Sequence, residues 1–467
     1  MGNRLLLLFI SVLVASCNNG DNRKSDETYL GGEIVNPRMR TVIIYKDDTV
    51  LDTVTLAEDN TFLYKFENAE EGLYTFHHNE LQWFYLTPSD SLMLRLNTLE
   101  FDESLHFSGT GDKENNFLIN IFLDNEEDSK TLSNFFMLPP DEFQQKLDSI
   151  SSLNQTKLKK FIAMHKPNKQ FREVAERILS YNKYIKKEFY TSVLHKSKDR
   201  VSETVFPKDF YNYREHIDLD GTQLQDHYSR IRFLDAYFSN LVYSSSQDSE
   251  VMDNRSYTHI YNKIEMMDSL LSNEFIKERL VKRNTRRYLL SAKEVTNEEK
   301  MVALAKNVLK SPENIAQIEA LAQATMKLTP GQNVPNVALV NTENETVELP
   351  EIIDKKSVLY FWSLESVKHY KDIHSKAAEL SSKFPEYRFI GINTDTHYKK
   401  WLKTVKGSGY SLDNEFQIND IQKAETSLVL NSHFKAVIVD EQGIILESNT
   451  NLFRTEIEEQ LLAYLNQ

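Results

Sequence analysis

The sequence has 467 residues and is acidic, with 55 Lys and Arg against 69 Asp and Glu and a formal net charge of −14. This balance argues against nucleic acid as a partner and against a basic membrane-binding face, because both need clustered positive charge. The length predicts roughly three domains of about 150 residues each. Cys17 is the only cysteine, so no disulfide can form within the chain and its cores alone must stabilise it.

The first sixteen residues have the pattern of an export signal. Arg4 supplies a short basic region, and residues 5–14 form a nearly unbroken apolar run that ends in small residues before Cys17. A membrane-spanning helix needs about 20 apolar residues, so this run is too short to span and is typical of a cleaved signal. Removing residues 1–16, whose one charge is Arg4, changes the net charge from −14 to −15.

The run Leu13-Val14-Ala15-Ser16-Cys17 resembles the lipobox of bacterial lipoproteins. The resemblance implies cleavage before Cys17 and acylation of that cysteine, which would attach the protein to the inner or outer membrane of a cell envelope. The body would then lie in the periplasm or at the cell surface. Residues 17–28 are polar and lack periodicity, so we expect a lipidated tether there. An ordinary signal peptide with an incidental cysteine is the alternative.

Residues 29–111 have the sequence pattern of an antiparallel β-sandwich. Short alternating runs are separated by turn residues, a spacing typical of antiparallel sandwiches and barrels. The expected strands cover residues 41–45, 50–56, 62–66, 72–76, 82–86 and 91–96.

Residues 112–327 change to a helical period. One helix is expected to start at Phe117, and a second to open at Pro139-Pro140-Asp141 with Asp141 as its cap. A third carries an apolar stripe over 223–243. Further helices are expected over 257–271, 274–290, 297–310 and 312–326. The spacing of the aromatic residues favours core packing over a hydrophobic ligand groove, and we see no fixed-period repeat.

Residues 328–467 alternate strands and helices, which predicts an α/β sheet with helices on both faces. Gly331 and Pro335 precede a short helix, and a buried strand then ends in Phe-Trp. The expected elements are a short helix over 349–353, a strand over 357–362, a helix over 366–384, a strand over 387–393, a helix over 395–403, a hairpin over 436–445 and a helix over 453–465.

The pattern LTPGQNVPNVALVNTENETVELPEIIDKKSVLYFWS resembles the entry of TlpA/ResA-like thioredoxin-family proteins. The earlier segments GLYTF, FYLTPSDSLMLRLNT and FDESLHFSGTGDKENNFL resemble the β-sandwich domain at the N-terminus of Bacteroidetes thioredoxin-like lipoproteins. Together these likenesses imply a β-sandwich, a helical domain and a thioredoxin-like domain. By family membership alone they imply a thiol-disulfide oxidoreductase or peroxidase.

The sequence departs from this family at its redox positions. In active relatives Phe-Trp is followed by Trp-Cys-x-x-Cys, whereas here the chain reads FWSLESVKHYKD and places Ser366 and His369 at the two thiol positions. A serine hydroxyl forms no disulfide, and Glu365 adds negative charge where the family has an aromatic residue. The family's cis-proline position is occupied by Phe434. We therefore expect a degenerate domain with no redox catalysis and no cofactor.

A binding role survives the loss of the thiols, since thioredoxin folds bind extended chains beside this face. We expect the protein to hold an envelope protein or peptide, with a candidate binding face made by Trp362, Glu365, Lys368, His433 and Lys435. The oxidoreductase is the alternative. In a third reading, the helical segment carries the function and the flanking modules are spacers.

Two other chemistries at this face were weighed. Ser366 and His369 lie three residues apart on a predicted helix, a spacing that would allow a nucleophile and base to touch, but no Gly-x-Ser-x-Gly elbow surrounds the serine. A metal site using His369, His374 and His433 is disfavoured, because residues five apart diverge around a helix. We therefore expect no metal and no catalytic residue.

Overall fold

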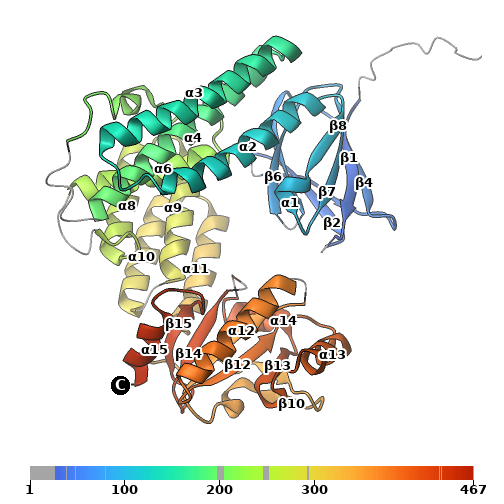
Figure 1. Ribbon diagram of the computed structural model, residues 1–467, viewed down its shortest axis with the longest axis vertical. Helices are drawn as coiled ribbons and strands as arrows, with labels where there is room; N and C mark the ends of the chain where they lie inside the picture. Colours follow the sequence, from blue (N-terminus) through green and yellow to red (C-terminus); the bar gives the residue numbers. More distant parts are fainter. Residues whose placement is uncertain are drawn as a thin grey trace, which may run out of the picture. The chain divides into compact units, whose positions relative to one another are not determined.

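The computed structural model describes most of the chain after its first 26 residues (Figure 1). The described residues are 27–37, 39–47, 49–78, 80–196, 205–245, 252–291, 294–364, 367–430, 432 and 434–465. The leader, Cys17, Glu365, Ser366 and His433 lie outside them, so the expectations at those positions stay predictions.

The chain divides into two compact units. One combines the described residues up to Thr131 with Ile150–Leu179, and the other combines Leu132–Ser149 with the described residues from Ser180 onward. The expected domain boundaries after residues 111 and 327 remain predictions. In the described part of the chain, every helix is too short or too polar to cross a bilayer.

The first unit holds two four-stranded sheets, ordered β4-β1-β7-β8 and β3-β2-β5-β6. All six expected strands are present, and the sequence analysis missed the first and last of the eight. One pair, β1 with β7, is parallel, whereas every other pair in these sheets is antiparallel. The strands are β1 Thr28–Val35, β2 Thr41–Lys46, β3 Thr49–Thr55, β4 Thr61–Phe66, β5 Gly72–His78, β6 Glu80–Leu86, β7 Ser91–Asn97 and β8 His106–Gly109.

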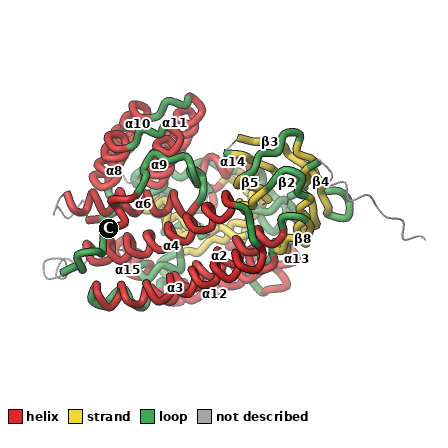
Figure 2. Tube along the Cα trace, turned by 90° about the horizontal axis from the view of Figure 1, so that it is seen from above, coloured by secondary structure: helices red, strands yellow, loops and turns green. Residues whose placement is uncertain are grey.

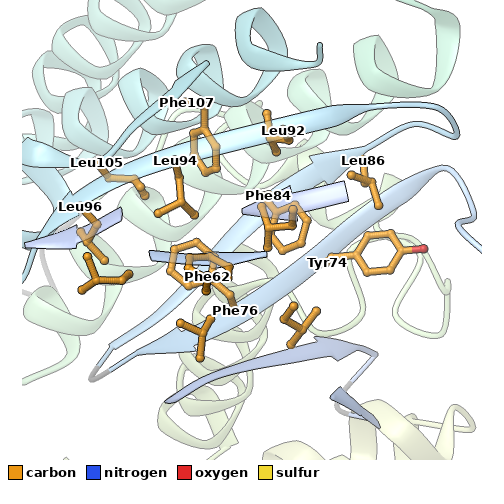
Figure 3. Close-up of a cluster of buried hydrophobic side chains, with 14 of the residues drawn as sticks. Phe62, Tyr74, Phe76, Phe84, Leu86, Leu92, Leu94, Leu96, Leu105 and Phe107 are labelled. Atoms are coloured by element: carbon orange, nitrogen blue, oxygen red, sulfur yellow. The ribbon is translucent and has the colours of Figure 1, made fainter. Parts of the chain in front are cut away.

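Alternation along the strands builds the core between these sheets. On β7, Leu92, Leu94 and Leu96 are buried, and they belong to the same cluster as the buried Phe76 and Phe84 of the other sheet (Figure 3). Successive side chains of a strand point to opposite faces, so one apolar set per strand suffices to fill the sandwich.

Helix α2 (Asp112–Ser133) begins five residues before the expected start at Phe117. Its first turns contain Asn115, whose side chain donates to Tyr85 O and accepts from Tyr85 N, both at 2.7 Å. Asn116 bonds the backbone N and O of Phe107 at 2.9 and 2.8 Å. The two asparagines therefore fasten the helix to strand backbones, a contact that helical periodicity cannot reveal.

Two long helices follow, and among the described residues between 112 and 326 every regular element is helical (Figure 2). Helix α3 (Pro140–His165) starts one residue before Asp141, so this aspartate lies within the first turn and the expectation that it caps the helix is wrong. Helix α4 (Lys169–Lys196) was not predicted. Four later helices match their expected ranges within about two residues: α8 Tyr257–Leu270, α9 Glu274–Leu289, α10 Val295–Val308 and α11 Pro312–Met326.

The expected helix over 223–243 starts late, because α6 spans Tyr228–Ser245. Before it, the chain folds around the buried guanidinium of Arg230, which donates to the carbonyls of Gln223 at 2.8 Å and Leu219 at 3.0 Å, and also to those of Asp218 and Gly221. Backbone carbonyls that satisfy this cation are not available for helical hydrogen bonds, so the segment stays a loop.

The C-terminal sheet has the order β10-β9-β13-β12-β11-β14-β15 (orange to red in Figure 1). The interior strand β11 is parallel to β12 and antiparallel to β14. The elements are β9 Ala338–Val340, β10 Thr346–Glu348, η2 Leu349–Ile352, β11 Ser357–Trp362, α12 Val367–Lys383, β12 Arg388–Asn393, α13 Tyr398–Ser408, η3 Leu412–Asn414, β13 Glu415–Ile418, α14 Ile421–Ser427, β14 Ala436–Val439, β15 Ile445–Thr450 and α15 Ile457–Leu465.

This arrangement is the thioredoxin fold: a β-α-β unit (β11-α12-β12) followed, after an insertion, by a hairpin and a helix (β14-β15-α15) on the same sheet. Strand β11 is buried on both faces. Its Leu359 and Phe361 join one core with α14, and its Val358 and Tyr360 join another with α12, α13 and α15. The predicted α/β sheet with helices on both faces is therefore confirmed, together with the sandwich and the helical segment.

Candidate functional site

The candidate site lies where β11 and β12 end, next to the start of α12 and the loop before β14. Asp395, just after β12, accepts hydrogen bonds from Ser363 Oγ at 2.7 Å and from the amide of Leu364 at 2.6 Å. Asn393 Nδ2 donates to the same carboxylate at 2.8 Å. Because three donors converge on it, Asp395 fixes the path of the chain as it leaves β11, at the position where active relatives begin their thiol motif.

His369, which the sequence analysis assigned to one of the two thiol positions, is buried and contacts one ring of an aromatic pair. Its ring meets that of Phe434 edge-on, with centroids 4.8 Å apart, and Phe434 meets Phe453 edge-on at 6.0 Å. Phe434 is 47% exposed and Phe453 is 41% exposed. We call Phe434 and Phe453 the aromatic patch. It presents two apolar rings to solvent.

Two members of the expected binding face do not reach the surface, which corrects the sequence analysis. Trp362 is fully buried, and its Nε1 donates to Glu415 Oε2 at 3.0 Å. Lys435 is also buried, and its Nζ donates to the carbonyls of Leu428 at 2.7 Å and Val429 at 3.2 Å. Burial lowers the pKa of Lys435 to about 8, despite the opposing effect of Glu447. Of the described members of that face, only Lys368 is exposed.

Sequence reasoning missed Glu415, the centre of a buried polar network beneath this face. Its carboxylate accepts from Tyr360 Oη at 3.1 Å, from Trp362 Nε1 and from His374 Nε2 at 3.1 Å. Burial, reinforced by the adjacent carboxylate, raises the pKa of Tyr360 well above its usual value. A Cβ at Gly391 would collide with this carboxylate, so glycine is required there.

This network joins α12 to the sheet. His374 is on α12, Tyr360 and Trp362 are on β11, and Glu415 opens β13. The ring of His374 stacks on Tyr410 with centroids 3.7 Å apart and an interplanar angle of 4°. The only part of this network that the sequence pattern indicated was the Phe-Trp end of the buried strand. Strand β13, which carries Glu415, has four residues and is too short to predict from periodicity.

The weighed metal site finds no support among the residues that the structure describes. His374 directs Nε2 to Glu415, and its Nδ1 lies 2.6 Å from Tyr370 O. No group of three or more His, Cys, Asp or Glu in the described ranges is arranged to hold a metal ion. The pairing of Ser366 with His369 and the placement of Glu365 and His433 fall outside those ranges.

Comparisons with known proteins give structural likeness only. The chain matches no family model and no curated protein. Among solved structures, it is similar to a proposed thiol-disulfide oxidoreductase from Bacteroides vulgatus, with 20% identity over 29% of this chain and 97% of that one and a TM-score of 0.27. It is also similar to a thiol:disulfide interchange protein from Bacteroides sp., with 16% identity over 30% of this chain and 93% of that one and a TM-score of 0.26.

The assignment of the C-terminal domain rests on its strand order rather than on these scores. The domain is thioredoxin-like, and with Cys17 as the sole cysteine the chain holds no Cys-x-x-Cys motif. A disulfide exchange cycle within one chain needs two thiols, so the single cysteine argues against redox activity.

Proposed function

We propose that this protein is a lipid-anchored envelope protein whose thioredoxin-like domain binds a protein or peptide partner and has no redox activity. The observation that carries the proposal is the aromatic patch, because it is exposed beside the position that lost its thiol. Exposed aromatic residues are the side chains most enriched at the centres of protein interfaces. Lys368, which precedes His369 in the first turn of α12, is exposed and adds a cation to the proposed face.

The loss of both thiols supports binding over catalysis. A hydroxyl or an imidazole at the thiol positions cannot carry electrons between substrates, and once acylated Cys17 has no free thiol. The matched assay is reduction of insulin disulfides by dithiothreitol with the full chain. We expect the rate of the buffer control, and turnover clearly above it would support the oxidoreductase instead.

Photo-crosslinking in cells tests the binding face. A photoreactive amino acid placed at position 434 or 453 should capture the same partner band, and Lys368→Glu should weaken that capture about ten-fold. Position 412 is the matched control, because Leu412 is 43% exposed in the same domain. Equal capture from position 412, or capture only from helices α6 and α8 to α11, would place the function elsewhere.

The anchor has its own test. Cys17→Ser should abolish incorporation of labelled palmitate and release the protein from the membrane fraction, whereas Ser16→Ala should leave both unchanged. Incorporation that survives Cys17→Ser would exclude the lipidated tether, whatever the binding face does.

A further inference from the structure

A second surface lies in the β-sandwich and is independent of the proposed function. It forms because strands β3 and β4 belong to different sheets. They are consecutive strands joined by the short segment 56–60, yet they do not pair with each other. Among the described residues, strand β3 pairs only with β2 and β4 pairs only with β1, so each is the edge of its own sheet. Both edges therefore leave backbone groups available for an added strand.

Strand β3 is unusually open for an edge. Its residues are exposed except for the half-buried Val54, with Val50 at 53% and Leu51 at 41%. On the neighbouring edge Leu63 is 58% exposed. Proteins generally protect such edges with lysine, proline or a covering loop, and β3 has neither lysine nor proline. Exposed β-branched and apolar side chains along an unpaired edge favour pairing with another extended chain.

A groove of about 820 Å³ opens between these two edges. Leu51 and Val54 line one wall, and Leu63 and Tyr64 line the other. Tyr74 closes one end: Figure 3 shows it at the margin of the core with its hydroxyl directed away, and that hydroxyl donates to Glu70 O at 3.0 Å. This volume lies within the range of sites that hold a ligand, and its long walls are strands rather than loops.

The cations that line the groove are engaged. Lys46 Nζ donates to Leu73 O at 3.1 Å and lies 4.1 Å from the ring centroid of Tyr74. Lys65 forms an ion pair with Glu27.

The acidic residues that line the groove form no ion pair among the described residues. They are Asp52, Glu67 and Glu70, although the charge of Glu67 helps to raise the pKa of Lys65. Asp52 and Glu67 both act on Tyr64, whose pKa is raised by burial and then by these two carboxylates. Three carboxylates outside any described ion pair, against two lysines that already have partners, make the groove complementary to a positively charged chain.

We propose that the β3–β4 groove binds an extended, basic peptide segment of a partner protein, which adds as a strand to the free edges. Main-chain hydrogen bonds to β3 or β4 would supply affinity, and alternate side chains of the segment would meet Tyr64 and Leu51. Its lysine or arginine side chains would pair with Asp52, Glu67 and Glu70. The acidic balance of the whole chain favours the same class of partner over an acidic one.

Fluorescence anisotropy of the full chain at low salt tests this with three labelled octapeptides. The first alternates lysine and valine, the second alternates glutamate and valine, and the third is the first with alternate backbone nitrogens methylated. We expect saturable binding of the first and about ten-fold weaker binding, or none, of the other two, because they lack the charge or the backbone donors.

Charge-reversal variants then locate the site. Asp52→Lys and Glu67→Lys should each weaken binding of the lysine-valine peptide about ten-fold, while Glu58→Lys, an equal change at the closed end of the β3–β4 turn, should leave it within about two-fold. All three positions are exposed, so the fold is retained. An equal loss in Glu58→Lys, or full binding of the methylated peptide, would overturn the proposal. Self-association of the chain that Asp52→Lys abolishes would also overturn it, by assigning the edges to a second copy.

Discussion

The helical segment and the thioredoxin-like domain bury carboxylates in opposite ways. In the helical segment, Glu188 is fully buried and accepts from Arg214 Nε at 2.9 Å and Nη2 at 2.6 Å, so charge is matched by charge. In the thioredoxin-like domain, Glu415 is held by the hydroxyl of Tyr360, the indole of Trp362 and the ring of His374. The first carboxylate is bound by a cation together with the neutral donors Tyr213 and Asn240, whereas the second is bound, among the described residues, by three aromatic side chains and no Arg or Lys.

The two regions therefore differ in how much stability they lose when one partner of the buried carboxylate is removed. Removing one partner of a buried ion pair leaves an uncompensated charge, while removing one of three polar donors leaves two. The helical segment also contains an intermediate case in Glu298, which accepts from Thr325 Oγ1 at 2.7 Å but whose Oε1 has no partner. Four substitutions sharpen the comparison.

The largest effect is expected from Arg214→Met. It leaves Glu188 buried with Tyr213 and Asn240 as its remaining donors, and should lower the free energy of unfolding by about 3 to 5 kcal/mol. Urea denaturation measures the loss. The matched control is Lys383→Met, which breaks exposed pairs with Glu379 and Glu458 and should cost less than about 1 kcal/mol. Equal losses in the two variants would contradict the buried pair's special role.

Glu298→Gln should change the pH dependence of stability. Burial raises the pKa of Glu298 from 4.5 to about 7, so the folded state holds a proton that the unfolded state releases between those pH values. Stability from this group is therefore present below pH 4.5 and is lost as the pH rises through 7, by about 3 kcal/mol. The wild type should lose this amount relative to the glutamine variant between pH 4 and pH 8 in urea titrations. Parallel curves for the two proteins would refute the assignment.

Glu415→Gln should cost about 2 kcal/mol, less than Arg214→Met, because an amide of the same shape keeps an acceptor but loses the charge-assisted bonds. Urea unfolding measures it, and near-ultraviolet circular dichroism should report the altered surroundings of Trp362. Glu425→Gln, an exposed change in the same domain, is the control. A cost above that of Arg214→Met would reverse the comparison.

Lys435→Met is expected to have the smallest effect, about 1 kcal/mol. It removes the ammonium that bonds Leu428 and Val429, and Val429 has a φ of 49°, a left-handed value that a β-branched residue rarely adopts. The loop that carries Phe434 should loosen, so amide exchange over residues 428–436 should accelerate while the rest of the domain is unchanged. Uniform acceleration across the domain would indicate global destabilisation instead.

Local pattern predicted much of this fold. Alternation with turn residues located six strands of the sandwich, and helical spacing located α8 to α11, since both signals are carried by neighbouring residues. The predicted start of α6 was wrong because the guanidinium of Arg230 donates hydrogen bonds to carbonyls of the preceding loop. The spacing of apolar residues carries no information about these bonds. Strand β13 and helix α14 were not predicted, because short buried elements contain too few repeats of the hydrophobic period.

The candidate site was predicted only in outline. The absence of a Cys-x-x-Cys motif is a matter of residue identity, so the sequence was enough for it, whereas the assignment of Ser366 and His369 to the thiol positions stays a prediction. The inclusion of Lys435 and Trp362 in an exposed face was wrong, because a lysine or a tryptophan is buried or exposed according to what packs over it.

The single cysteine and the absence of a Cys-x-x-Cys motif were evident from the sequence alone, because they follow from covalent composition, which no folding can change. The sequence also determined the order of sandwich, helices and α/β domain, because backbone periodicity is local. Only the tertiary structure decided which polar groups meet at Glu415, that Phe434 and Phe453 stand together beside His369, and that β3 and β4 part to leave a groove. These features join residues far apart in the chain, and their free energy arises from burial and pairing that exist only once the chain has folded.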